Sequence, residues 1–119
     1  MILIGNILIG LIAFLHFYIM ILEMFFWDKP KGIKAFGHEM EFAKLTTVMA
    51  ANQGLYNGFI AAGLLISIIS SLFLIKIFFL GCVFIAGIYG SITFNRKILF
   101  IQSVPSIIAL VVVLISIFL

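Results

Sequence analysis

A histidine and a glutamate stand seven positions apart in the first apolar run of the chain, at His16 and Glu23. On an α-helix this interval is about two turns, so both side chains share one face and lie about 10 Å apart along the axis. Burial in apolar surroundings favours the neutral form of both groups, so both are candidate sites of proton exchange. A water molecule or an amide would have to connect them.

A second polar cluster interrupts the apolar sequence at AANQGLYNG, which carries Asn52, Gln53, Tyr56 and Asn57. An unsatisfied polar group in hydrocarbon costs several kcal/mol, so these side chains need partners. Hydrogen bonds between helices are one explanation, because each contributes about 0.6 to 2 kcal/mol in a membrane. Three amides and a phenol exceed what helix contacts need, and we interpret the cluster as the lining of a hydrated pocket.

The composition identifies the class of protein that must position these residues. The chain has 119 residues, of which 66% are hydrophobic and 9% charged, and its mean hydropathy is +1.41. Such values are typical of an integral membrane protein, and about 20 apolar residues are needed for each helical crossing. We expect an all-α, polytopic membrane protein with one domain over residues 1–119 and four transmembrane helices in one bundle. The expected spans are residues 2–27, 45–69, 74–94 and 98–119.

The segment between the first two spans contains residues that break helices. Pro30 and Gly32 are expected to stop the first helix. Residues 33–44 mix charged and aromatic side chains, as an interfacial lead-in to the second helix would. We expect His38 and Glu39 to form a solvated pair within this segment.

Basic residues predict the orientation of the spans. Six of the seven lie in the first and third connections, namely Lys29, Lys31, Lys34, Lys44, Arg96 and Lys97. Under the positive-inside rule these connections are cytoplasmic, so both termini are expected to be extracytoplasmic. Lys76 lies near the opposite end of the third span, where its ammonium group can snorkel to the interface. The short basic connections give no indication of nucleic-acid binding.

Helical-wheel positions predict one polar stripe on each span. His16, Met20, Glu23 and Trp27 align on the first span, Tyr89 and Thr93 on the third, and Gln102 and Pro105 on the fourth. Pro105 also predicts a kink. If the stripes converge, they line a pocket open to the cytoplasm. Its predicted polar lining is His16, Glu23, Asn52, Gln53, Tyr56, Asn57, Tyr89 and Gln102, with Met20, Trp27 and Thr93 as walls.

The opposite face of the second span consists of small residues, including Gly54 and Gly58 in a GxxxG arrangement. Small residues allow close approach of another helix, so this face is expected to pack against a neighbour. No metal site is expected, because His16, Glu23 and His38 lack close ligand spacing on one face. No motif for another cofactor occurs.

Five segments together resemble a known family: LHFYIMILEMFFW, KAFG, AANQGLYNGFIAAGL, AGIYG and ILFIQSVPSIIAL. The chain resembles small bacterial four-helix membrane proteins grouped as domain-of-unknown-function family thirteen-oh-four. This resemblance implies a four-helix fold in the bacterial inner membrane, and it brings no established activity. It adds Gly87 and Gly90 to the residues of interest. We expect these two glycines, like Gly54 and Gly58, to lie where helices pack together.

The leading hypothesis is a plasma-membrane protein that binds and moves a small amphipathic molecule with proton coupling. Its partners would be membrane lipid and that ligand, and a homodimer is plausible because four helices are few for an alternating-access path. One alternative is a membrane-embedded enzyme that modifies a lipid, with Glu23 or His16 as general acid and base. Another is a structural or accessory subunit whose polar stripe binds a partner helix.

Overall fold

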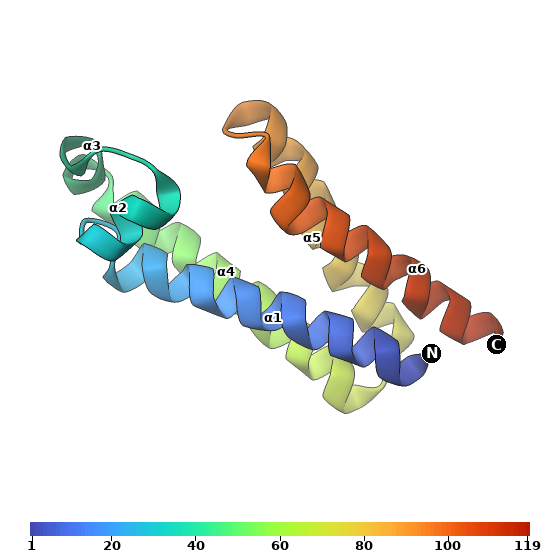
Figure 1. The fold of residues 1–119 in the computed structure, drawn as a ribbon. Coiled ribbons are helices and arrows are strands. Elements are labelled where there is room, and N and C mark those ends of the chain that lie inside the picture. Colours follow the sequence, from blue (N-terminus) through green and yellow to red (C-terminus); the bar gives the residue numbers. More distant parts are fainter. The chain divides into compact units, whose positions relative to one another are not determined.

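The computed structural model describes residues 1–119, which form helices and no strand. Four stretches are long and apolar enough to cross a membrane, and they lie where the four spans were predicted. The last of them combines a π-helical turn, η1, with α6. The elements in chain order are α1 (Ile2–Phe25), α2 (Pro30–Phe36), α3 (Met40–Leu45), α4 (Thr47–Ser70), α5 (Phe73–Thr93), η1 (Leu99–Ser103) and α6 (Val104–Phe118) (Figure 1).

The chain forms two compact units. The central unit comprises residues 14–61, and the terminal unit comprises residues 1–13 together with 62–119. Helices α1 and α4 each contribute to both units. A single domain over the whole chain stays a prediction.

The connection after α1 in the central unit differs from the expected one. Helix α1 already ends at Phe25, and Pro30 begins α2 instead of stopping the first helix. Proline suits the first helical position because its φ is preset and its missing N–H is not needed there. Gly32 lies inside α2, where an added Cβ would overlap the carbonyl oxygen of Phe26. Gly37 ends α2 with φ 73°, and its N–H donates to the Ile33 carbonyl at 2.8 Å.

The terminal unit has an apolar core built from α1, α4, α5 and α6. Its buried side chains include Ile9, Ile12, Leu64, Leu80, Val83 and Val113. Glycines allow two of the contacts: a Cβ at Gly5 would lie 3.4 Å from Val113, and one at Gly63 would overlap the ring of Phe79. Helices α4 and α5 are joined by a tight turn in which Ser71 has φ 57°. The connection consists of Ser71 and Leu72, and Ser71 adopts the left-handed backbone that non-glycine residues seldom take.

The start of the fourth span is π-helical and ends at Ser103, two residues before Pro105. The N–H of Val104 donates to the Leu99 carbonyl, five residues earlier. Ser103 is buried in this turn, and its hydroxyl donates to the Phe84 carbonyl on α5 at 2.8 Å. Gly87 makes room for this contact, because an added Cβ there would overlap the Ser103 hydroxyl. The backbone before Pro105 is thus a π turn held against α5, and the kink predicted at Pro105 itself stays a prediction.

Candidate functional site

A short side-chain hydrogen bond in the central unit joins α1 to α4. The side-chain amide of Asn57 donates to Oε1 of Glu23 at 2.6 Å. Glu23 is only 8% exposed, although it carries an ionisable carboxyl group. A buried carboxyl that accepts a short hydrogen bond from a neutral amide is the central feature of the candidate site.

Two glycines on α4 bring the helices close enough for this bond. A Cβ at Gly54 would lie 2.7 Å from Cγ of Met24, 3.0 Å from Cβ of Glu23 and 3.1 Å from the carbonyl oxygen of Met20. A Cβ at Gly58 would lie 2.6 Å from Sδ of Met20. Met20 and Glu23 of α1 therefore pack against the small-residue face of α4, and Asn57 lies at the edge of that face.

The rest of the α4 polar cluster has a different environment. Asn52 and Gln53 are exposed, and the amide of Asn52 donates to the Val48 carbonyl of its own helix at 2.9 Å. Tyr56 is also exposed, with its ring centroid 6.1 Å from that of Phe59. Of the four clustered residues, Asn57 makes the hydrogen bond to Glu23.

His16 lies on α1 in the same unit and is 2% exposed. Met20 stands between His16 and Glu23 in the sequence and is half-buried against Gly58. The two ionisable groups of the predicted α1 stripe are thus both removed from solvent. Removal of charge from water favours neutral forms unless a partner compensates, so the hydrogen bond from Asn57 is the main compensation for a Glu23 carboxylate.

Trp27 does not continue the polar stripe of α1, because the helix ends before it. Its ring packs on His38 at 4.1 Å and on Phe36 at 5.0 Å between centroids, and its indole N–H donates to the Thr46 hydroxyl at 2.9 Å. The structure places Trp27 in an aromatic cluster of the central unit, and its role as a pocket wall stays a prediction. Phe42 completes the cluster, 5.9 Å from the His38 ring.

His38 is the clearest departure from the expected solvated pair with Glu39. Its Nε2 lies 3.1 Å from the carbonyl oxygen of Trp27, and its Nδ1 is buried without a hydrogen-bond partner. The flanking aromatic residues supply a contact surface that a histidine can share. Their clustering around His38 in the sequence was the signal that could have indicated this packing.

The predicted site residues of the terminal unit lie on α5 and η1. Tyr89 is 70% exposed, Thr93 donates its hydroxyl hydrogen to the Tyr89 carbonyl at 2.8 Å, and Gln102 is half-buried. Gly87 faces Ser103 and Gln102, while a Cβ at Gly90 would lie 3.1 Å from the side chain of Ile98. Convergence of the polar stripes of all four spans on one pocket stays a prediction.

Sequence reasoning missed one buried pair in the terminal unit. Lys76 does not snorkel: it is 3% exposed, and its Nζ donates to Oδ1 of Asn6 at 2.8 Å. The ammonium nitrogen also lies 5.3 Å from the ring centroid of Phe73. No periodicity could have joined positions so far apart in the chain, although each is a polar interruption of an apolar run.

The fold and the buried carboxyl–amide pair define an all-helical protein with four helices suited to cross a membrane. The family described as "Protein of unknown function (DUF1304)" matches residues 10–114, and the chain belongs to this family. The chain is also similar to "Uncharacterized protein YpaA" of Lactococcus lactis subsp. lactis (strain IL1403), with 36% identity over 106 residues. That alignment covers 85% of this chain and 88% of the relative. No solved structure matches the chain.

Proposed function

We propose that the chain is a multi-pass protein of the bacterial plasma membrane that binds and moves a small amphipathic molecule, with Glu23 as the proton-exchanging group. The observation that carries the proposal is the buried Glu23 carboxyl bonded to Asn57 across two helices. Ionisable groups inside membrane helices are costly, and they commonly mark ion or substrate pathways. The distribution of basic residues supports an orientation with both termini outside.

A neutral amide is a suitable partner for a carboxyl that changes protonation state. The Asn57 amide nitrogen donates to a carboxylate, and its carbonyl oxygen can accept from a protonated carboxyl after the amide rotates. A salt bridge would lack this property, because loss of one charge leaves the other unpaired. Glu23 can therefore bind and release a proton without leaving a buried countercharge.

The ligand-binding part of the proposal uses the other polar side chains. His16 extends the ionisable stripe of α1, while Asn52, Gln53 and Tyr56 supply amide and hydroxyl groups on the exposed face of α4. Sites for small molecules combine apolar walls with a few such polar groups, which favours an amphipathic ligand.

Reconstitution in proteoliposomes tests the proton-exchange role directly. Glu23→Gln keeps the shape and a hydrogen bond to Asn57 but cannot titrate, so we expect it to abolish proton flux coupled to the ligand. The ligand is first identified among small molecules that copurify with the wild-type chain. Glu39→Gln is the matched control, because Glu39 is exposed in the connecting segment and should leave flux unchanged. Full flux in Glu23→Gln would reject the proposal.

A specific observation favours a second candidate function. Asn52, Gln53 and Tyr56 form an exposed polar face on a helix suited to cross a membrane. Hydrogen bonds to a partner helix would satisfy these groups, as expected for an accessory subunit. Loss of a copurifying membrane protein in Gln53→Leu, with no proton flux in the wild type, would support this function over transport.

A further inference from the structure

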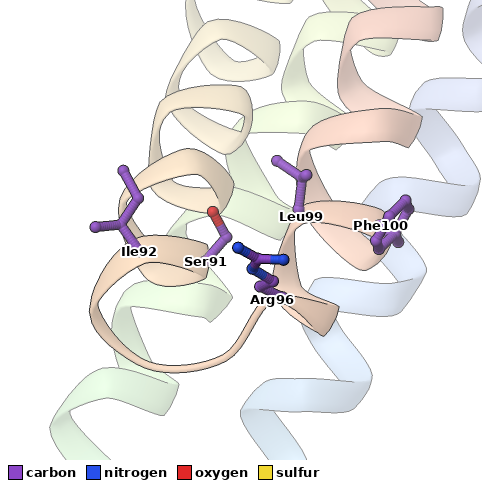
Figure 2. Close-up of a pocket in the computed structure, with 5 residues that line it drawn as sticks. All are labelled: Ser91, Ile92, Arg96, Leu99 and Phe100. Carbon is purple, nitrogen blue, oxygen red and sulfur yellow. The ribbon is translucent and has the colours of Figure 1, made fainter.

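A pocket outside the proposed transport site lies at the end of α5. It has a volume of about 480 Å³ and is lined by Ser91, Ile92, Arg96, Leu99 and Phe100. All five residues belong to the terminal unit, and none is among the predicted ligand-binding residues. Figure 2 shows Arg96 rising from the turn between Ser91 on α5 and Leu99 on η1.

The pocket has a cation and no anion of its own. All four acidic residues of the chain lie within positions 23–41, in the central unit, so the terminal unit has no acidic side chain to pair with Arg96. The hydroxyl of Ser91 donates to the Ile88 carbonyl at 2.7 Å, so the guanidinium supplies the available donors. Its planar array of N–H groups matches the oxygens of a phosphate.

The rest of the lining is apolar and outward-facing. Ile92 and Phe100 are both largely exposed, and Leu99 completes the wall beside Arg96. A free phosphate ion would use only the guanidinium and leave these side chains uncovered. A molecule with a phosphate head and a hydrocarbon chain would use both parts of the pocket.

We propose that this pocket binds an anionic phospholipid, with its phosphate on Arg96 and an acyl chain along Ile92 and Phe100. The inference rests on the membrane insertion proposed above, which places Arg96 at the cytoplasmic headgroup level. Basic pockets between membrane helices on that side recognise anionic headgroups. Lys97 lies outside the lining and adds only general attraction to an anionic surface.

Lipid binding to the full chain in neutral detergent tests the proposal, with native mass spectrometry as the readout. Wild type should retain phosphatidylglycerol in preference to phosphatidylcholine of the same acyl chains. Arg96→Gln should weaken phosphatidylglycerol binding about tenfold, because the bidentate phosphate contact is lost. Lys97→Gln removes the same charge from the next residue and should weaken binding less than about threefold.

Two further comparisons make the result decisive. Arg96→Lys keeps the charge but not the planar donors, so it should bind phosphatidylglycerol more weakly than wild type even if Arg96→Gln fails to fold. Inorganic phosphate should not displace the lipid; displacement at millimolar phosphate would identify a free-anion site and overturn the lipid assignment. Equal loss in Arg96→Gln and Lys97→Gln, or equal binding of both lipids, would also overturn it. Glu23→Gln should retain the lipid, which separates this site from the proposed transport function.

Discussion

The two units solve the same problem with opposite charges. The central unit buries the Glu23 carboxyl and pairs it with the donor side of an asparagine amide, at Asn57. The terminal unit buries the Lys76 ammonium and pairs it with the acceptor side of another, at Asn6. An amide has both a donor and an acceptor, so it can satisfy either charge without adding a second one.

The two buried side chains differ in reach, and the shorter one lies at a close helix contact. The short glutamate side chain meets Asn57 only because Gly54 lets α1 approach α4 closely. The lysine has a flexible four-carbon stem, so it can reach Asn6 from a more distant backbone. Close packing is therefore a requirement of the carboxyl pair and not of the ammonium pair.

Gly54→Leu should lower the free energy of unfolding more than any other substitution considered below. The new side chain would displace Met24 and the backbone of α1 at Met20, so we expect a loss of about 3 kcal/mol in the free energy of unfolding. The matched control is Gly10→Leu, because a Cβ at Gly10 meets nothing within 4 Å. Reversible unfolding in mixed micelles measures both. Equal losses would show that close approach at Gly54 is not what positions Glu23.

Removal of each amide should lower the free energy of unfolding, and the two losses should depend on pH in opposite directions. Asn57→Leu and Asn6→Leu each leave a buried charged group without its hydrogen bond, at a cost of about 2 kcal/mol. The deficit of Asn57→Leu should shrink as pH falls, because a protonated carboxyl is neutral. That of Asn6→Leu should shrink as pH rises, because a deprotonated amine is neutral.

Unfolding measured against wild type across pH checks these two opposite trends. Asn52→Leu serves as the control, since its amide bonds only to a carbonyl of its own helix. A common trend with pH in both variants would mean that the amides do not stabilise the charged forms.

The smallest expected effect on stability concerns the aromatic cluster around Trp27 and His38 in the central unit. Thr46→Val removes the acceptor of the Trp27 indole N–H, so the free energy of unfolding should fall by about 1 kcal/mol. Thr47→Val is the control at the adjacent position at the start of α4. The near-ultraviolet circular dichroism of Trp27 should change in Thr46→Val alone. An unchanged signal would mean that ring contacts, and not the hydrogen bond to Thr46, hold the Trp27 side chain in position.

The spans were predictable because apolar runs of the length of a bilayer have few other structural solutions. The short helices between α1 and α4 were missed, although Pro30 at the start and Gly37 at the end of α2 carry the local chemistry of a helix start and stop. Glu23 and Asn57 were both singled out from their residue types. Their pairing was not, because a helical wheel assigns residues to faces but does not say which face of α4 meets α1.

For the same reason, the Lys76–Asn6 pair was not predicted, and a second preference also opposed it. Its two members lie on different helices, and the wheel of α5 gives no information about α1. A lysine three residues after the first residue of a span is expected to extend outward, since that costs least for a helix alone. The partner on a neighbouring helix reverses that preference, which is a property of the tertiary structure.

The π turn at Leu99–Ser103 determines where the fourth span can lose or gain a residue. Its hydrogen-bonded ring contains one residue more than an α-helical ring. Deletion of one residue inside the turn can restore α-helical geometry and leave Ser106, Ala109 and Val113 facing the core. Deletion of one residue after Ser106 would instead rotate everything beyond it by about 100°. Length differences among relatives should therefore be tolerated in the π turn and excluded from α6.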